Sequence, residues 1–310
     1  MGQALSMPDL PGDRTRLPTR RRVMRGVAAV GVSCFAGAAY AFGVEPHFRL
    51  DVARYALSLP GWRGGPMKIV ALADIHACEP WMPASRVRAI VAQANALKPD
   101  LVVLLGDYVN SLHRFREAAV PPADWGAALS DLRAPLGVHA VLGNHDFWEG
   151  SGPAPVRAAL RTAGARLYEN EAAALDHQGQ TFWLAGTGSL WARPLGRGRY
   201  LGTNDLSRAL RQVSGDAPVI LLAHEPDQFA SVPGRVALTL SGHTHGGQVR
   251  LPGLGAPFVP SQFGQRYIYG HVTEDVRQLV ISGGLGCSGL PVRVGVPPEI
   301  TVIDIAPMQA

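Results

Sequence analysis

The stretch MKIVALADIH, residues 67–76, carries the pattern on which the fold depends. Residues 67–73 form a nearly continuous apolar run, which is typical of a strand buried on both faces. The run stops at Asp74 and His76. An amphipathic helix is predicted next, over residues 85–97, because apolar residues recur there at helical spacing. The stretch therefore predicts a strand that delivers polar residues and is followed by a covering helix.

Similar apolar runs recur along the rest of the chain. A second helix is predicted around residues 124–132. The further runs of strand length are 101–105, 138–142, 182–185, 219–223, 236–240, 279–281 and 300–305. The early alternation of strands and helices indicates an α/β fold. The second half has more strands than helices, so we expect mixed sheets and not purely parallel ones.

Polar clusters follow several of these predicted strands. The carboxyl ends of neighbouring strands meet at one crevice, and the alternating spacing within two of the clusters can place both side chains on one face. The candidate residues are Asp74, His76, Asp107, Asn144, His145, Asp146, His224, His243 and His245. Carboxylate, imidazole and amide donors without a thiolate suit Mn, Fe, Zn, Co or Ni. The clusters therefore predict a metal centre.

Each cluster alone carries little information, because a lone histidine is usually a packing or surface residue. Gly143-Asn144-His145-Asp146 and Gly242-His243-Thr244-His245-Gly246 are much rarer combinations. All five clusters in this order resemble the calcineurin-like metallophosphoesterase superfamily over about residues 67–305. The resemblance implies an α/β fold in which two mixed β-sheets pack as a sandwich flanked by helices.

The same resemblance implies a role for each residue. Asp74, His76 and His245 would hold one divalent metal ion, Asn144, His224 and His243 would hold the other, and Asp107 would bridge them. His145 would act on the substrate as general acid or as hydrogen-bond donor to the phosphate, with Asp146 orienting it. A hydroxide that bridges the metals would then attack phosphorus.

Departures from the superfamily pattern narrow the class. Its protein phosphatases carry arginines near the second and third clusters, where this chain has Asn110-Ser111 and Leu142. Its purple acid phosphatases have a tyrosine ligand at the position of Asn110. Two stretches, Gly242 to Gln248 and Ser282 to Ile300, resemble the bacterial exported or membrane-associated branch typified by YkuE and YaeI. Relatives in that branch include enzymes that cleave UDP-2,3-diacylglucosamine.

The first 44 residues have the composition of a leader. Arg20 and Arg21 precede an uncharged run rich in Gly and Ala, which resembles a twin-arginine export signal. Ala39-Tyr40-Ala41 is an acceptable cleavage site, but the run is also nearly long enough to span a bilayer. Cleavage and retention as an anchor remain alternatives, and both place the catalytic part outside the cytoplasm. Residues 45–66 would form a connecting strand and loop between the leader and a catalytic domain at residues 67–310.

Charge and cysteine content exclude other classes. The formal charge is +5, but residues 1–41 hold six arginines against two aspartates, so the remainder is nearly neutral. Nucleic-acid binding is therefore not expected. Of three cysteines, only Cys78 and Cys287 lie in the predicted domain. Their spacing does not decide whether they pair.

The sequence predicts a hydrolase of phosphate esters that requires two divalent metals. A phosphodiesterase or pyrophosphatase acting on small-molecule or lipid-linked phosphate esters is favoured, and a phosphomonoesterase is the alternative. A non-catalytic metal scaffold predicts missing ligands, and none is missing. A two-metal peptidase would not explain Gly143-Asn144-His145-Asp146. Substrate, metal identity and oligomeric state are left open.

Overall fold

The computed structural model describes residues 19–112, 119–148, 152–251 and 253–307. The chain divides into two compact units, with the division after Tyr40. The first unit contains helix α1 (Arg20–Ala39), and none of its side chains is buried. By length and composition, the helical stretch Arg20–Phe48 is apolar enough to cross a membrane, and a signal sequence has the same properties.

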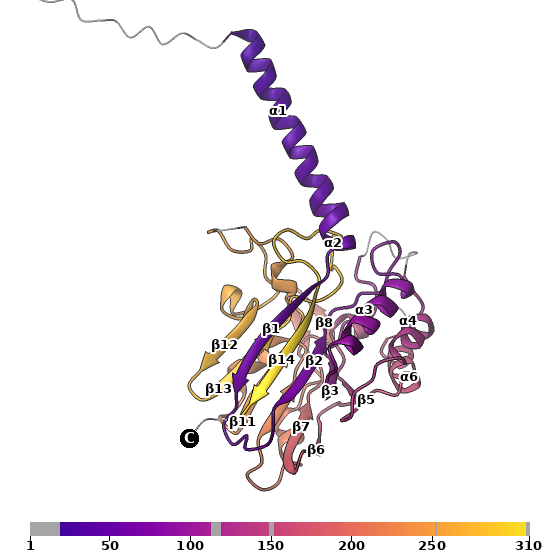
Figure 1. The fold of residues 1–310 in the computed structure, drawn as a ribbon, viewed down its shortest axis with the longest axis vertical. Helices are drawn as coiled ribbons and strands as arrows, with labels where there is room; N and C mark the ends of the chain where they lie inside the picture. The colour runs from indigo at the N-terminus through magenta and orange to yellow at the C-terminus, as the bar shows by residue number, and fades with distance from the viewer. Residues whose placement is uncertain (1–18, 113–118, 149–151, 252, 308–310) are drawn as a thin grey trace, which may run out of the picture. The chain divides into compact units, whose positions relative to one another are not determined.

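The second unit contains two six-stranded sheets (Figure 1). The first sheet has the order β1 (Asp51–Ser58), β14 (Glu299–Ala306), β2 (Met67–Leu72), β3 (Leu101–Leu104), β4 (Val138–Ala140), β5 (Arg166–Leu167). The second has the order β12 (Gly270–Glu274), β13 (Arg277–Ile281), β11 (Val236–Ser241), β10 (Val219–Leu222), β7 (Gln180–Gly186), β6 (Glu171–His177). A separate hairpin joins β8 (Arg193–Gly196) to β9 (Arg199–Leu201).

Both sheets are mixed, as the sequence predicted. In the first, β14 runs antiparallel to β2 while its other pairings are parallel. In the second, β12 and β6 are the antiparallel edge strands. The α/β sandwich fold is therefore confirmed. The segment 45–66, expected to connect the leader to the domain, contributes β1, which pairs with β14 along its whole length.

Short helices connect and cover these strands. The α-helices are α2 (Glu45–Phe48), α3 (Ala84–Ala96), α4 (Pro122–Leu129), α5 (His145–Trp148), α6 (Ala154–Thr162) and α7 (Leu206–Leu210). Single turns of other types are η1 (Tyr40–Val44), η3 (Pro226–Ser231), η4 (His245–Gly247) and η5 (Gly264–Tyr267). Helices α3, α4 and α6 lie together on one side of the first sheet in Figure 1.

The apolar strands are buried on both faces because each sheet face has a partner. In β3, Leu101 and Val103 pack in the core between the two sheets, whereas Val102 and Leu104 pack in the core under helices α3 and α4. Successive strand residues point to opposite faces, so a strand covered on both sides must be apolar throughout. This explains why the sequence shows continuous apolar runs and no alternation.

Acid should weaken the sheet at His139, a buried residue of β4. Its Nε2–H donates to the Leu136 carbonyl at 2.8 Å, and its Nδ1 accepts from the Tyr168 hydroxyl at 3.0 Å. Burial lowers the pKa of His139 below its ordinary value of 6.5, and Arg166 lowers it further. The unfolded chain therefore binds more protons than the folded chain once the pH falls below 6.5, so stability is lost there on acidification.

We expect His139→Gln to flatten the dependence of the unfolding midpoint on pH in that range. The measurement is denaturant unfolding with a chelator present, so that metal release does not contribute. His271→Gln, at an exposed position on β12, is the matched control and should keep the wild-type slope. The same slope in all three proteins would contradict the prediction.

Candidate metal centre

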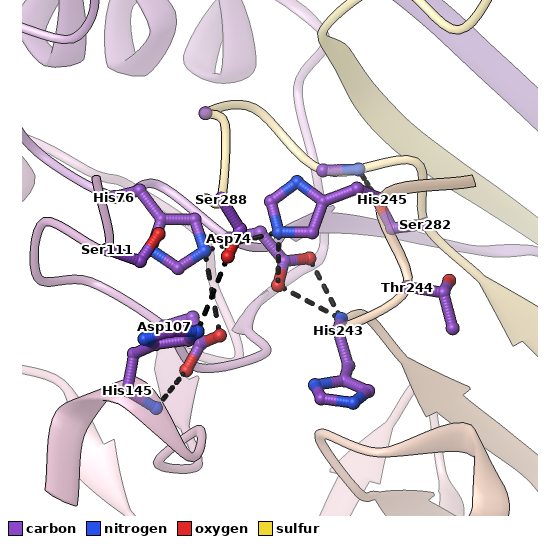
Figure 2. A network of polar contacts seen from close by, with 12 residues as sticks. Asp74, His76, Asp107, Ser111, His145, His243, Thr244, His245, Ser282 and Ser288 are labelled. Atoms are coloured by element: carbon purple, nitrogen blue, oxygen red, sulfur yellow. Dashed lines mark hydrogen bonds and ion pairs between the residues drawn. The ribbon is translucent and has the colours of Figure 1, made fainter. Parts of the chain in front are cut away.

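The predicted site residues lie just beyond the ends of central strands. Asp74 and His76 follow β2, Asp107 follows β3, and Asn144 to Asp146 follow β4. On the second sheet, His224 follows β10, while His243 and His245 follow β11. Figure 2 shows that the side chains of Asp74, His76, Asp107 and His245 point toward one another. The two sheets thus bring together residues up to 171 positions apart in the sequence.

The backbone at these positions is left-handed. Positive φ angles occur at Asp74 (54°), His76 (46°), Asp107 (58°), His243 (71°) and His245 (52°). Non-glycine residues rarely adopt this conformation, and such strain clusters at functional sites. The sequence predicted that alternation along a strand would place Asp74 and His76 on one face, and His243 and His245 likewise. That reason for their convergence is wrong. These residues have left the strands, and tight left-handed turns aim their side chains at the crevice.

Two glycines allow the ligand loops to approach each other. A Cβ at Gly106 would lie 2.5 Å from the Gly143 nitrogen, and a Cβ at Gly143 would lie 2.2 Å from an Asp107 carboxylate oxygen. Real Cβ atoms do not come that close to other heavy atoms. The glycines preceding Asp107 and Asn144 therefore have a steric role in building the site.

The described residues form two groups with the composition of metal sites. Asp74, His76 and His245 offer ligand atoms within 4.8 Å of one another, and so do Asp107, His224 and His243. All six residues are buried.

Asp107 lies between the two groups. Its Oδ2 atom is 3.2 Å from Nε2 of His224 and 3.6 Å from Nε2 of His76. A carboxylate in this position can reach an ion in either group.

The remaining predicted residues border these groups. The Oδ1 atom of Asn144 lies 3.1 Å from Nε2 of His224, so it faces the second group. The His145 backbone N–H donates to Asp107, and its ring Nε2 lies 3.4 Å from the Ser288 hydroxyl. Asp146 accepts three backbone N–H groups, from Asp107, Tyr108 and Gly143. These bonds tie two ligand loops together, whereas an effect of Asp146 on the His145 ring stays a prediction.

The buried carboxylates and histidines of this site have shifted pKa values when no metal is bound. Burial raises the pKa of Asp74 to about 7, and the charge of Asp107 acts in the same direction. Burial also opposes ionisation of Asp107, but the surrounding histidines, above all His224, hold its pKa well below the usual range. Burial likewise lowers the pKa of His243 and His245, which are therefore neutral and have nitrogen lone pairs available.

This donor set fits divalent cations. Nε2 of His243 is buried without a hydrogen-bond partner in the described chain, and Nε2 atoms of His76 and His245 face each other at 3.2 Å. Two imidazole nitrogens at that distance can share one proton or coordinate one ion. The Nδ1 atoms of His76 and His224 donate to backbone carbonyls at 2.9 and 2.7 Å, the arrangement that orients histidine ligands in metal sites.

A cavity of about 280 Å³ opens beside Asp107, His145, His243 and His245. Its far wall is aromatic. The Tyr200 ring stacks on Trp191 at 4.8 Å and on Trp148 at 5.7 Å, and Trp191 packs edge-on against His243. The sequence does not predict this wall, because single aromatic residues in three separate segments form no pattern.

Two buried charged residues support the site, and neither was predicted. Arg293 is fully buried and donates to the carbonyls of Gly283, Gly286 and Val296. It thereby fixes the loop whose Gly286 N–H donates to the Asp74 carbonyl at 2.7 Å. Glu225 accepts the backbone N–H of Leu190 and holds the loop that carries Trp191. Only the quoted stretch Ser282 to Ile300 drew attention to this part of the chain.

Tyr108 and the domain cysteines are packing residues. The Tyr108 hydroxyl donates to the Val141 carbonyl, and its ring stacks on Trp125. Cys78 and Cys287 are both free thiols in one small apolar cluster with Leu112.

The sequence is similar to those of known proteins. Residues 67–247, more than half of the chain, match the calcineurin-like phosphoesterase family. The chain belongs to that family, and it is a metal-dependent hydrolase of phosphoric esters. The resemblance and the enzyme class expected from the sequence are confirmed.

Three relatives illustrate the similarity. The chain is 30% identical to the uncharacterized metallophosphoesterase YkuE of Bacillus subtilis, over 93% of this chain and 97% of that protein. It is 29% identical to the phosphodiesterase YaeI of Escherichia coli, over 93% of this chain and 99% of that protein. A transmembrane protein with metallophosphoesterase domain from Danio rerio is 32% identical over 84% of this chain and 57% of its own length.

Proposed function

We propose that the protein is a phosphodiesterase or pyrophosphatase with two divalent metal ions. Asp74, His76 and His245 would hold one ion, Asn144, His224 and His243 the other, and Asp107 would reach both. When bound, such ions supply Lewis-acid chemistry, which activates water as the nucleophile and neutralises charge on the phosphate. Support comes from the two buried ligand groups and from the relative named phosphodiesterase YaeI.

The lining of the cavity favours a diester over a monoester. The described residues that line the cavity include no arginine or lysine. Positive charge for a substrate phosphate would therefore come only from bound metal ions and His145. A phosphate monoester dianion needs more positive charge than a diester monoanion, and protein phosphatases of the superfamily supply it with arginines. This single observation carries the choice of substrate class. A phosphomonoesterase remains the alternative.

His145 has the position of a group that can transfer a proton. It lines the cavity, it is held through its backbone by Asp107, and its Nε2 faces the cavity residue Ser288. Protonated His145 would donate to the leaving oxygen, while Trp148 packs against its ring at 4.6 Å and limits its rotation.

The test is a substrate comparison with the full chain after metal loading with Mn, Fe, Zn, Co or Ni in turn. Bis-p-nitrophenyl phosphate, p-nitrophenyl phosphate and UDP-diacylglucosamine are offered as diester, monoester and lipid-linked pyrophosphate. We expect kcat/KM for the diester or pyrophosphate to exceed that for the monoester. Faster monoester hydrolysis would favour the phosphomonoesterase, and no hydrolysis with any metal would favour a non-catalytic scaffold.

We also propose that residues 1–44 act as a twin-arginine leader or anchor that places the catalytic part outside the cytoplasm. Helix α1 begins at Arg20, directly at the arginine pair, and continues through the uncharged run. Export in the folded state would let the enzyme acquire its metals in the cytoplasm, where metal availability is controlled.

Changing Arg20 and Arg21 together to lysine should strand a folded, active enzyme in the cytoplasm. The measurement is cell fractionation of a fusion reporter, with metal-dependent hydrolysis assayed in each fraction. Arg197→Lys together with Arg199→Lys, at exposed positions of the hairpin, is the matched control and should export normally. Undiminished export of the leader variant would show that the run acts as an ordinary signal or anchor.

A further inference from the structure

The exposed large apolar side chains of the second unit are unevenly distributed. Among the described residues from Ala41 onward, they lie in segments 42–48, 195–201 and 251–263 and at Leu290, with Val276 as the exception. Leu254 is 81% exposed and Phe258 72% exposed. Such side chains are ordinary when scattered, but a gathered set marks an interaction surface.

Contacts show that these segments adjoin one another around the metal cavity. A cavity of about 740 Å³ is lined by Leu195 of the β8–β9 hairpin and by Phe258 of the loop between η4 and η5. It shares Trp191 and Tyr200 with the smaller cavity at the metal ligands. The hairpin and the loop therefore form the outer mouth of the site.

The other two segments join this mouth through backbone hydrogen bonds. The Arg250 N–H donates to the Val294 carbonyl at 2.8 Å, and the Arg293 N–H donates to the Ala41 carbonyl at 3.0 Å. The Gln248 side-chain amide donates to the Leu290 carbonyl. Segment 42–48 thus begins beside the loop that holds Arg293 and Val294, and this loop is bonded in turn to Arg250. We call the whole set, segments 42–48, 195–201 and 253–263 with Leu251 and Leu290, the apolar rim.

Charge has a single sign over long stretches around the rim, and the acidic residue within the rim itself, Glu45, is buried. Residues 187–204, 242–273 and 282–298 contain no aspartate or glutamate. Arg193, Arg197 and Arg199 of the hairpin are exposed and form no ion pair with a described residue. Arginines beside exposed leucine and phenylalanine match a surface that has an apolar interior and anionic groups at its edge.

We propose that the apolar rim docks on an anionic lipid bilayer. Leu254, Phe258 and Leu195 would enter the boundary between headgroups and acyl chains, while the hairpin arginines would bind lipid phosphates. A soluble protein partner is less well matched, because the rim combines exposed Leu254 and Phe258 with arginines that form no ion pair with a described residue, and an anionic lipid surface suits both kinds of group at once. The proposal goes beyond hydrolysis and does not rest on it. It places the cavity mouth at the lipid surface.

The test measures bilayer contact at single positions of the full chain. In a Cys34→Ser background, which leaves only the buried Cys78 and Cys287, cysteine replaces Leu254, Leu195 or Val276 and carries an environment-sensitive fluorophore. Each protein is reconstituted in nanodiscs of anionic or zwitterionic lipid. We expect quenchers on the lipid chains to quench probes at 254 and 195 at least two-fold more than the probe at 276. Aqueous iodide should show the opposite order.

Equal quenching at all three positions would overturn the proposal. Protection from iodide that develops in detergent without a bilayer, and rises with protein concentration, would instead assign the rim to a second copy of the chain and overturn it too. Replacing Arg193, Arg197 and Arg199 together with glutamine should reduce lipid quenching at 254 in anionic nanodiscs to the zwitterionic level. Unchanged quenching would reject the role of anionic lipid.

Discussion

Asp107→Ala is expected to lose both metal ions and nearly all hydrolysis. The Asp107 carboxylate lies 3.2 Å from His224 in one ligand group and 3.6 Å from His76 in the other. Without it, the centre has one negative charge less for two dications. The loss of metal affinity should exceed the roughly 10- to 100-fold that follows removal of a residue hydrogen-bonded to a metal ligand. Elemental analysis of the purified variant measures the metal content, and steady-state kinetics measures the activity.

A companion variant separates charge from folding. Asp107→Asn keeps an acceptor for the His145 backbone N–H, which donates to Asp107 at 2.9 Å, but removes the negative charge. It should fold as the wild type does and still bind less metal. Asp131→Ala, at an exposed carboxylate paired with Arg133, is the control and should retain both ions. Two ions bound to folded Asp107→Ala would reject the bridging position.

Much of the fold follows from apolar runs that a single sequence displays. The runs at 101–105 and 219–223 correspond to β3 and β10, because strands covered on both faces must be continuously apolar. Edge strands gave weaker signals. Strand β1 lies at the edge of its sheet and pairs with β14 on one side only. Asp51 and Arg54 interrupt its apolar residues. A strand at the border of a sheet needs fewer apolar residues, so segment 45–66 was predicted only as a connecting strand and loop, without its partner strand.

Some features of the candidate site could also be predicted from the sequence, and others could not. The candidate ligands could be proposed because metal coordination demands particular donor atoms, and the donor types of Asp107 and His245 can be read without coordinates. The left-handed backbone that aims those side chains could not, since it depends on close contact between loops such as Gly106 with Gly143. The role of Arg293 could not be predicted for a related reason. Its guanidinium donates to backbone carbonyls, and every residue has a carbonyl whatever its type.

His145→Ala is expected to keep both metals and to lose about 10²- to 10⁴-fold in kcat on substrates with poor leaving groups. The His145 ring is absent from both buried ligand groups, yet it lines the cavity beside them. A proton donor matters most when the departing oxygen is strongly basic. Nitrophenolate leaves without protonation, so nitrophenyl esters should lose much less. The measurement is kcat for an alkyl and a nitrophenyl diester with each protein, together with metal content.

His145→Gln tests the same idea with less disturbance of packing, because its side chain fills more of the space beside Trp148, whose ring lies 4.6 Å from that of His145. It should show the same dependence on the leaving group. His271→Ala, an exposed histidine of β12, should leave both substrates unaffected. A uniform loss on both classes of substrate would mean that His145 binds the phosphate group in the ground state and transition state alike. Its role would then be that of a hydrogen-bond donor to phosphate, and the leaving oxygen would take its proton from water.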